Sequence, residues 1–322
     1  MMKHWLSRFV PKGRTTVTAV PYTWLLVFFV LPFFFVLKIS FSEPTIAKPP
    51  YTPLVQVTED TKVTVSLNPA PYRTLTKEVD EFATKPWTEA RQDSQYLVAY
   101  WNAIKLALLT TILTLLIGYP IAYNIARADD STRNTLLMLV MIPFWTSFLL
   151  RVYAWIGILK TNGLINNVLL ASGIISTPLP LLNNTFSVVL ALVYSYLPFM
   201  ILPLYATLER MDLSLLEAAA DLGCRPFRAF LAVTLPLSLP GIAAGCLLVF
   251  IPMVGEFVIP DLLGGPDTLM IGKVLWDEFF TNRDWPAAAA VAIAMLVFLV
   301  APIAVAQRLL RGEGHSQQEG PA

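Results

Sequence analysis

Six stretches of this 322-residue chain are each long and apolar enough to cross a membrane as a helix. The hydrocarbon core of a bilayer is about 30 Å thick, and a helix needs about 20 apolar residues to span it. Only 14% of the residues are charged, whereas a soluble domain carries about 25%. A water-soluble protein is therefore excluded, and we expect an all-α polytopic membrane protein with six transmembrane helices. The stretches are residues 20–41, 97–127, 135–159, 185–208, 236–259 and 286–308.

Basic residues gather on one side of these six predicted helices. They lie in the N-terminal tail (1–19), in the connections after the second and fourth spans, and in the C-terminal tail (309–322). Short loops rich in Lys and Arg stay on the cytoplasmic side of a membrane. We therefore expect both termini to be cytoplasmic. The basic residues are Lys3, Arg8, Lys12, Arg14, Arg127, Arg133, Arg210, Arg225, Arg228, Arg308 and Arg311.

The connection formed by residues 42–96 is the one long loop, and the same argument places it outside the cytoplasm. It combines Pro-rich sequence with a strand-like stretch, residues 62–67, and its acidic residues outnumber its basic ones. This composition suits contact with a protein partner, and it suits a solvated loop equally well.

Few residues of the chain offer catalytic chemistry. Two cysteines and two histidines are too few for a disulfide framework or a metal site made of Cys and His. The run Gly264-Gly265-Pro266 lacks the Lys-Ser/Thr that follows a phosphate-binding loop. We expect no catalytic residue, no metal site and no bound cofactor in this chain.

The cytoplasmic connection between the fourth and fifth spans is too polar to cross a membrane and too regular to be a slack loop. Ser214 and Glu217 have the spacing of a capping box, and Gly223 is the expected left-handed stop of the helix that they begin. Pro226 can then open a second helix. We predict a helix, a tight turn and a second helix that lie on the membrane face.

These same residues resemble a known family. Glu217-Ala218-Ala219, then Gly223, Val233 and Leu235-Pro236, are similar to the loop that permeases of binding-protein-dependent ABC importers present to their ATPase. The resemblance implies the type I ABC importer permease (MetI-like) fold, with a five-helix core at 97–308 and cytoplasmic coupling helices at 209–235. It assigns ATPase coupling to Glu217, Ala218, Ala219, Asp221 and Gly223.

Further stretches resemble one subfamily, the permeases of polyamine importers, and its putrescine type most of all. They are residues 117–120, 143–155, 162–167, 254–266 and 279–286. The resemblance implies an ATP-driven importer subunit in a bacterial inner membrane, which moves putrescine or a related polyamine by alternating access. It implies as partners a second related permease, a dimer of ATPase subunits that uses ATP and Mg²⁺, and a periplasmic polyamine-binding protein, but no nucleic acid.

A polyamine path needs carboxylates to replace the hydration of ammonium groups, and aromatic faces for charge and methylenes. Glu256, near the outer mouth of the fifth span, is the carboxylate candidate, and its backbone is expected to be irregular because Pro252 and Gly255 precede it. A structural ion pair between Glu256 and Arg151 is the competing interpretation. The aromatic candidates are Trp145 and Tyr196, with Tyr123 as the cytosolic one.

Two other readings stay open. One is a permease of the same family for ferric iron, thiamine or sulfate, although Glu256 and the acidic residues of the connection after the fifth span favour a cation. An ion-coupled secondary transporter belongs to a different class, and it would want carboxylates deep in the bilayer, where these spans have none.

Overall fold

The computed structural model describes residues 13–57, 63–84 and 94–315. Lys3, Arg8 and Lys12 of the predicted cytoplasmic tail lie outside these ranges. The chain divides into two compact units. The first is built from residues 1–80 and 277–296, and the second from residues 81–276 and 297–322. Each unit is described by itself below.

The first unit begins with one long apolar helical stretch. It runs through α2 (Gly13–Leu25), a π-helical turn η1 (Leu26–Val30) and α3 (Leu31–Ile39). Thr18–Ile39 is long and apolar enough to span a membrane, which agrees with the first predicted span. None of its most hydrophobic 18-residue window is buried in the protein. Lipid is the natural environment for such a surface.

Most of the long connection, up to residue 80, belongs to the first unit. Strands β1 (Val55–Val57) and β2 (Val63–Val65) pair antiparallel, and β2 lies inside the predicted strand-like stretch, residues 62–67. The sequence reading missed a helix, α4 (Ala70–Thr84). The Asn68 side chain accepts a hydrogen bond from the Ala70 backbone N–H at its start. Tyr72 joins α4 to the end of α3, because its hydroxyl lies 2.7 Å from the Ser40 hydroxyl.

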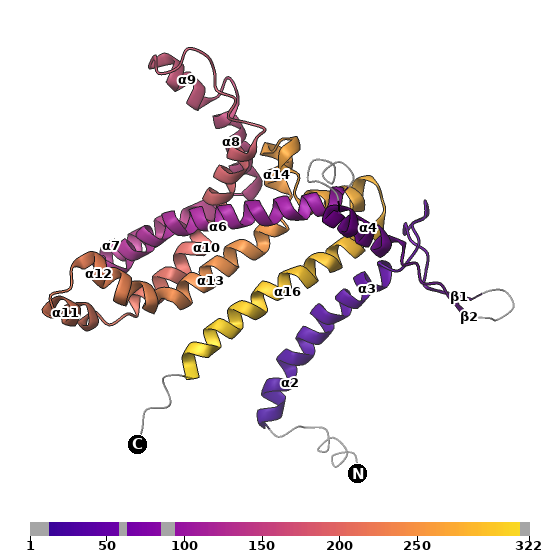
Figure 1. Ribbon diagram of the computed structural model, residues 1–322, viewed down its shortest axis with the longest axis horizontal. Helices are drawn as coiled ribbons and strands as arrows, with labels where there is room; N and C mark the ends of the chain where they lie inside the picture. The colour runs from indigo at the N-terminus through magenta and orange to yellow at the C-terminus, as the bar shows by residue number, and fades with distance from the viewer. Residues whose placement is uncertain (1–12, 58–62, 85–93, 316–322) are drawn as a thin grey trace, which may run out of the picture. The chain divides into compact units, whose positions relative to one another are not determined.

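The second unit is built on three long helices, α6 (Gln95–Arg127), α10 (Thr185–Glu209) and α13 (Leu235–Val254). They pack side by side (Figure 1). The α10 helix begins where predicted, at a capping box formed by Asn184 and Ser187, and it ends one residue later than predicted. Gly245 of α13 allows close packing on α10: a Cβ atom there would lie 2.7 Å from Met200 Sδ.

The third predicted span, residues 135–159, is not one helix. The chain forms α7 (Asp130–Met141), a 3-10 turn η2 (Ile142–Trp145) and then α8 (Phe148–Leu159). Pro143 lacks a backbone N–H, and Thr146 and Ser147 are extended, with ψ of 149° and 136°. These three residues break the helix. A short helix, α9 (Leu164–Ala171), follows α8.

Short elements complete the second unit. They are α11 (Ser214–Asp221), α12 (Pro226–Ala229), the π-helical turn η3 (Phe230–Thr234), α14 (Val258–Leu263), the 3-10 turn η4 (Pro266–Thr268) and α15 (Ile271–Trp276). The π-helical turn η5 (Asp277–Thr281) belongs to the first unit, and α16 (Trp285–His315) begins there and continues into the second.

Within the described residues, five helical stretches are long and apolar enough to span a membrane: Thr18–Ile39, Gln95–Arg127, Phe148–Ala171, Thr185–Glu209 and Pro226–Val254. The sixth predicted span falls in α16, whose apolar part Trp285–Val300 is shorter. The membrane-spanning architecture is thus helical, as predicted, and the only strands in the described ranges are β1 and β2.

Candidate functional site: the coupling loop and the central cavity

The loop between α10 and α13, residues 210–234, is the coupling loop. It folds as a helix, a turn and a second helix, as predicted. The capping box of Ser214 and Glu217 is not formed, because the helix α11 begins one residue earlier than a Ser214 cap requires. Asp212 caps the start of α11 instead, because its carboxylate accepts a hydrogen bond from the Ser214 backbone N–H at 3.0 Å. This hydrogen bond lowers the pKa of Asp212 below its ordinary value.

Gly223 ends α11 in the left-handed conformation that was predicted, with φ of +75°. The Gly223 N–H donates to the Ala220 carbonyl at 2.8 Å, and the Cys224 N–H donates to the Ala219 carbonyl at 2.9 Å. This pair of bonds is a Schellman motif, which satisfies carbonyl groups at the end of a helix. Residues with a Cβ atom adopt this φ at a cost, so glycine suits the turn.

The surface of this loop is open. Glu217, Ala218, Asp221 and Gly223 are exposed, and Ala219 is half-buried. The apolar side chain of Leu222 is 89% exposed, and that of Phe227 is 72% exposed. Large apolar side chains at this level of exposure, beside small residues, form a surface on which another protein can dock closely.

Phe230 of η3 connects the coupling loop to the core of the second unit. Its ring makes edge contacts with Tyr119 and Tyr123 of α6, with centroids 5.6 and 6.4 Å away. The Tyr119 hydroxyl lies 2.9 Å from the Ser238 hydroxyl of α13. A displacement of the loop would therefore be transmitted to both α6 and α13. Tyr123, predicted to line a substrate path, takes part in this junction, and Arg127 lies over its ring.

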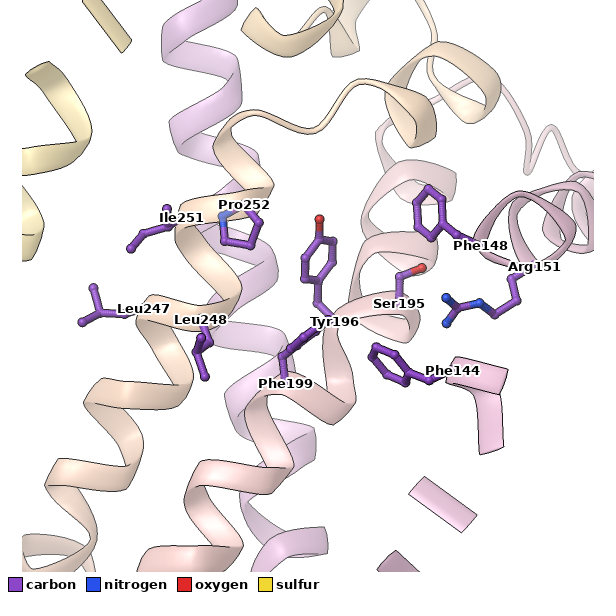
Figure 2. Close-up of a pocket in the computed structure, with 10 residues that line it drawn as sticks. All are labelled: Phe144, Phe148, Arg151, Ser195, Tyr196, Phe199, Leu247, Leu248, Ile251 and Pro252. Carbon is purple, nitrogen blue, oxygen red and sulfur yellow. The ribbon is translucent and has the colours of Figure 1, made fainter. Parts of the chain in front are cut away.

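A cavity of about 550 Å³ opens between α10, α13 and the η2–α8 segment (Figure 2). Its walls are mostly aromatic and aliphatic, and the polar groups among them belong to Arg151, Ser195 and Tyr196. The residues that line it are Phe144, Phe148, Arg151, Ser195, Tyr196, Phe199, Leu247, Leu248, Ile251 and Pro252.

Glu256 lies beside this cavity and bonds to one of its walls. The Tyr196 hydroxyl donates to Glu256 Oε2 at 2.8 Å, and the Val258 and Ile259 backbone N–H groups donate to Oε1 at 3.0 and 3.5 Å. The carboxylate therefore caps α14. As predicted, its backbone is irregular: α13 ends at Val254, and helix resumes only at Val258. The structure thus brings together two of the predicted path residues, Tyr196 and Glu256.

The structure does not join Arg151 to Glu256. The described residues give no ion pair between them, and Glu256 accepts its bonds from Tyr196 and α14 instead. The Arg151 guanidinium lies 5.4 Å from the ring centroid of Phe144 and 5.7 Å from that of Phe148. Figure 2 shows it directed toward Ser195.

Trp145, like Tyr123, does not join Tyr196 and Glu256. It belongs to η2, is 78% exposed and does not line the cavity, whereas its neighbour Phe144 does. Phe144 and Phe199 both line the cavity and meet edge to face, with ring centroids 5.1 Å apart. The sequence reading did not select either residue. Their signal was weak, because apolar aromatic residues occur throughout the spans.

Two acidic side chains that follow the fifth predicted span have local structural partners. Asp261 pairs with Lys273 at 2.8 Å, and Asp284 accepts the Ala287 backbone N–H at the start of α16. Within the described part of the chain, no three His, Cys, Asp or Glu side chains come together in a group that would hold a metal ion.

Comparisons with known proteins agree with this architecture. Residues 2–311 match the family described as the binding-protein-dependent transport system inner membrane component, and the chain belongs to this family. It is 36% identical, over 92% of its length and 94% of the relative's, to the spermidine/putrescine transport system permease protein PotB of Haemophilus influenzae. It is 41% identical to the Escherichia coli protein of the same name, over 64% of this chain and 75% of that one.

Solved structures show the same fold. A bacterial ABC transporter that imports the acidic polysaccharide alginate matches with a TM-score of 0.64 and 17% identity, over 92% of this chain and 96% of that one. The MetNI methionine ABC transporter, in an inward-facing conformation, matches with a TM-score of 0.52 over 67% of this chain and 95% of that one. The chain therefore has the fold of ABC importer permeases and is a multi-pass membrane transport subunit.

Proposed function

We propose that this chain is a permease subunit of an ATP-driven importer that moves putrescine or a related polyamine into the cytoplasm. The observation that carries the proposal is the 36% identity, over 92% of the chain, to a protein named as a spermidine/putrescine permease. The structure adds a carboxylate beside an aromatic cavity, which suits an ammonium cation on a chain of methylenes.

The site at Glu256 has capacity for a cation. A carboxylate offers about four lone-pair positions, and three protein N–H or O–H groups approach those of Glu256. An ammonium group can therefore bind to Glu256 without displacing the cap of α14. The rings of Tyr196 and Phe199 then offer faces to the methylenes.

The coupling loop connects this chain to ATP hydrolysis in a partner subunit. We place its exposed surface, from Glu217 to Gly223, against a separate ATPase subunit, which binds ATP and Mg²⁺, while this chain binds no cofactor. Closure of an ATPase dimer would move α11 and, through Phe230, both α6 and α13. This movement would open the path alternately to each side of the membrane. The assembly also includes a second related permease and a periplasmic polyamine-binding protein, and both termini of this chain are cytoplasmic.

Uptake by intact cells tests the proposal. The gene is deleted in its native host, and the uptake of labelled putrescine, spermidine, thiamine, sulfate and ferric iron is compared with and without the chain supplied from a plasmid. We expect the deletion to remove most high-affinity putrescine or spermidine uptake and the plasmid to restore it. Unchanged polyamine uptake, with loss of uptake of another solute, would contradict the assigned substrate class.

A further inference from the structure

Two nitrogen atoms of the Arg151 guanidinium lack a hydrogen-bond acceptor among the described residues. Its Nε and Nη1 atoms are buried, and neither has a hydrogen-bond partner among the residues that the structure describes. Its contacts are the faces of Phe144 and Phe148. Arginine stays charged in proteins and has five N–H donors, so rings alone leave it unsatisfied. Buried charges in proteins are paired, and the described part of the chain supplies no carboxylate to Arg151.

The position of the cavity makes lipid headgroups remote as acceptors for Arg151. Ser195 and Tyr196, which share the cavity with Arg151, lie near the middle of the 25-residue helix α10. At 1.5 Å per residue, the middle of this helix is roughly 15 to 20 Å from either end. Lipid phosphates lie at the edge of a hydrocarbon core about 30 Å thick, so they are remote from this level.

The cavity wall is open and apolar around Arg151. The cavity residues Leu248 and Phe199 are 51% and 38% exposed. A single charge at the centre of an exposed apolar surface is the arrangement found at the energetic centres of protein interfaces. A polyamine cannot complete the pair, because it carries the same sign of charge as arginine.

We propose that Arg151 receives a carboxylate from the second permease subunit, which inserts an acidic side chain into this cavity. The inference rests on the proposed function, because that function requires a second membrane subunit. Arginine and a carboxylate can form two parallel hydrogen bonds, which fix orientation as well as charge. Glu256 does not fill this role, since the described residues give no ion pair between it and Arg151. The pair also neutralises a charge that would repel a polyamine at Glu256.

Co-purification measures the contribution of Arg151 to assembly. The tagged chain is purified in mild detergent from its native host as the wild type, as Arg151→Gln and as Lys160→Gln, and the recovered second permease is quantified by mass spectrometry. Lys160→Gln is the matched control, because it removes an exposed cation at the end of the same helix. We expect Arg151→Gln to lower recovery about tenfold or more and the control to leave it unchanged. Full recovery with Arg151→Gln overturns the proposal.

If the Arg151→Gln chain is not retained in the membrane, photo-crosslinking of a chain that keeps Arg151 tests the proposal instead. A benzoylphenylalanine replaces Phe148, membranes are irradiated, and the adduct is identified by peptide mass spectrometry. We expect an adduct with a second permease within one helical turn of an Asp or Glu, and replacing this acid with its amide should reproduce the loss seen with Arg151→Gln. An adduct with phospholipid alone, or with no acidic residue nearby, overturns the proposal.

These results are separable from the choice of substrate. If the cells take up another solute but Arg151→Gln still releases the second permease, the assigned substrate fails and the arginine contact stands. If putrescine uptake depends on the chain but Arg151→Gln retains its partner, the substrate stands and the contact fails.

Discussion

The two oxygens of the Glu256 carboxylate accept hydrogen bonds from different groups. Its Oε1 atom caps α14 through two backbone N–H groups, while its Oε2 atom holds the Tyr196 hydroxyl. Capping needs only an oxygen acceptor, which glutamine also supplies. Attraction of an ammonium group needs the negative charge. Changes that separate these properties therefore test whether Glu256 contacts the substrate.

We predict that Glu256→Gln lowers the maximal rate of polyamine uptake by about tenfold or more, because a hydrogen bond to a charged group is worth about 1.5 to 3 kcal/mol. Tyr196→Phe keeps the carboxylate and should lower the rate less. Glu43→Gln, which changes an exposed carboxylate in the long connection, is the control. Uptake of labelled putrescine is measured at equal amounts of chain in the membrane. Normal uptake with Glu256→Gln would leave this residue with a purely structural role.

At the level of elements, the coupling loop depends on the turn that separates α11 from α12. Gly223 has φ of +75°, and a Cβ atom added there would meet no atom within 4 Å. Gly173, which follows α9, has φ of +72° and is equally open. A β-branched residue strains both turns in the same way, and only one of them lies in the predicted ATPase contact.

We therefore predict that Gly223→Val lowers polyamine uptake by about tenfold or more, because the reshaped turn no longer fits its partner. Gly173→Val, which carries the same backbone strain, should keep uptake within about twofold of the wild type. Both variants are compared at equal levels in the membrane. Equal losses from the two changes would mean that the strain acts on the stability of the chain and not on coupling.

The packing of α13 on α10 depends on small residues. We predict that Gly245→Leu lowers the free energy of unfolding by about 1 to 3 kcal/mol, the usual cost of overpacking. The reason is the approach of its Cβ atom to within 2.7 Å of Met200 Sδ and 3.3 Å of the Met200 carbonyl oxygen. The melting temperature in detergent measures the change. Gly157→Leu on α8 is the control, because a Cβ atom there meets nothing within 4 Å. Equal melting temperatures for the two variants would contradict this packing.

The start of α7 gives a prediction about pH. Asp129 accepts hydrogen bonds from the Ser131 hydroxyl and the Thr132 N–H, which lower the pKa of its carboxyl to about 2. The ionised form is favoured in the folded chain, so this stabilisation is present above about pH 4 and is lost as the pH falls toward 2. We predict that Asp129→Ala lowers the melting temperature between pH 5 and 8 by a constant amount. This difference should shrink below pH 4, and a difference that persists at pH 2 would contradict the prediction.

At the level of the whole molecule, the features with strong local signals were predictable from sequence. The bounds of α10 were predicted to within one residue, because its apolar stretch is long and its start is polar. The left-handed stop at Gly223 and the second helix opening at Pro226 were also correct. These features depend on one stretch of chain and on backbone chemistry, which a single sequence contains. The family resemblance likewise rested on contiguous motifs and was confirmed.

Features that depend on several segments were harder to predict. The helix α4 was missed although Tyr72, Leu75 and Val79 recur with helical spacing, because the Pro-rich sequence before them favoured a loop. The third span breaks at Pro143 and at the extended residues that follow it, whereas one continuous span was predicted there. The partner of Glu256 depends on how α10 rotates about its axis. Spans that are apolar on all sides leave that rotation undetermined.

The central claim is that this chain forms the membrane path of an ATP-driven polyamine importer. The most direct measurement is uptake of labelled putrescine by liposomes that contain the complex purified through a tag on this chain, with the binding protein on one side and ATP with Mg²⁺ on the other. The account predicts accumulation that requires ATP and that falls about tenfold or more when the complex carries Glu256→Gln. Accumulation without ATP, or a complex that contains no ATPase and moves no polyamine, would contradict it.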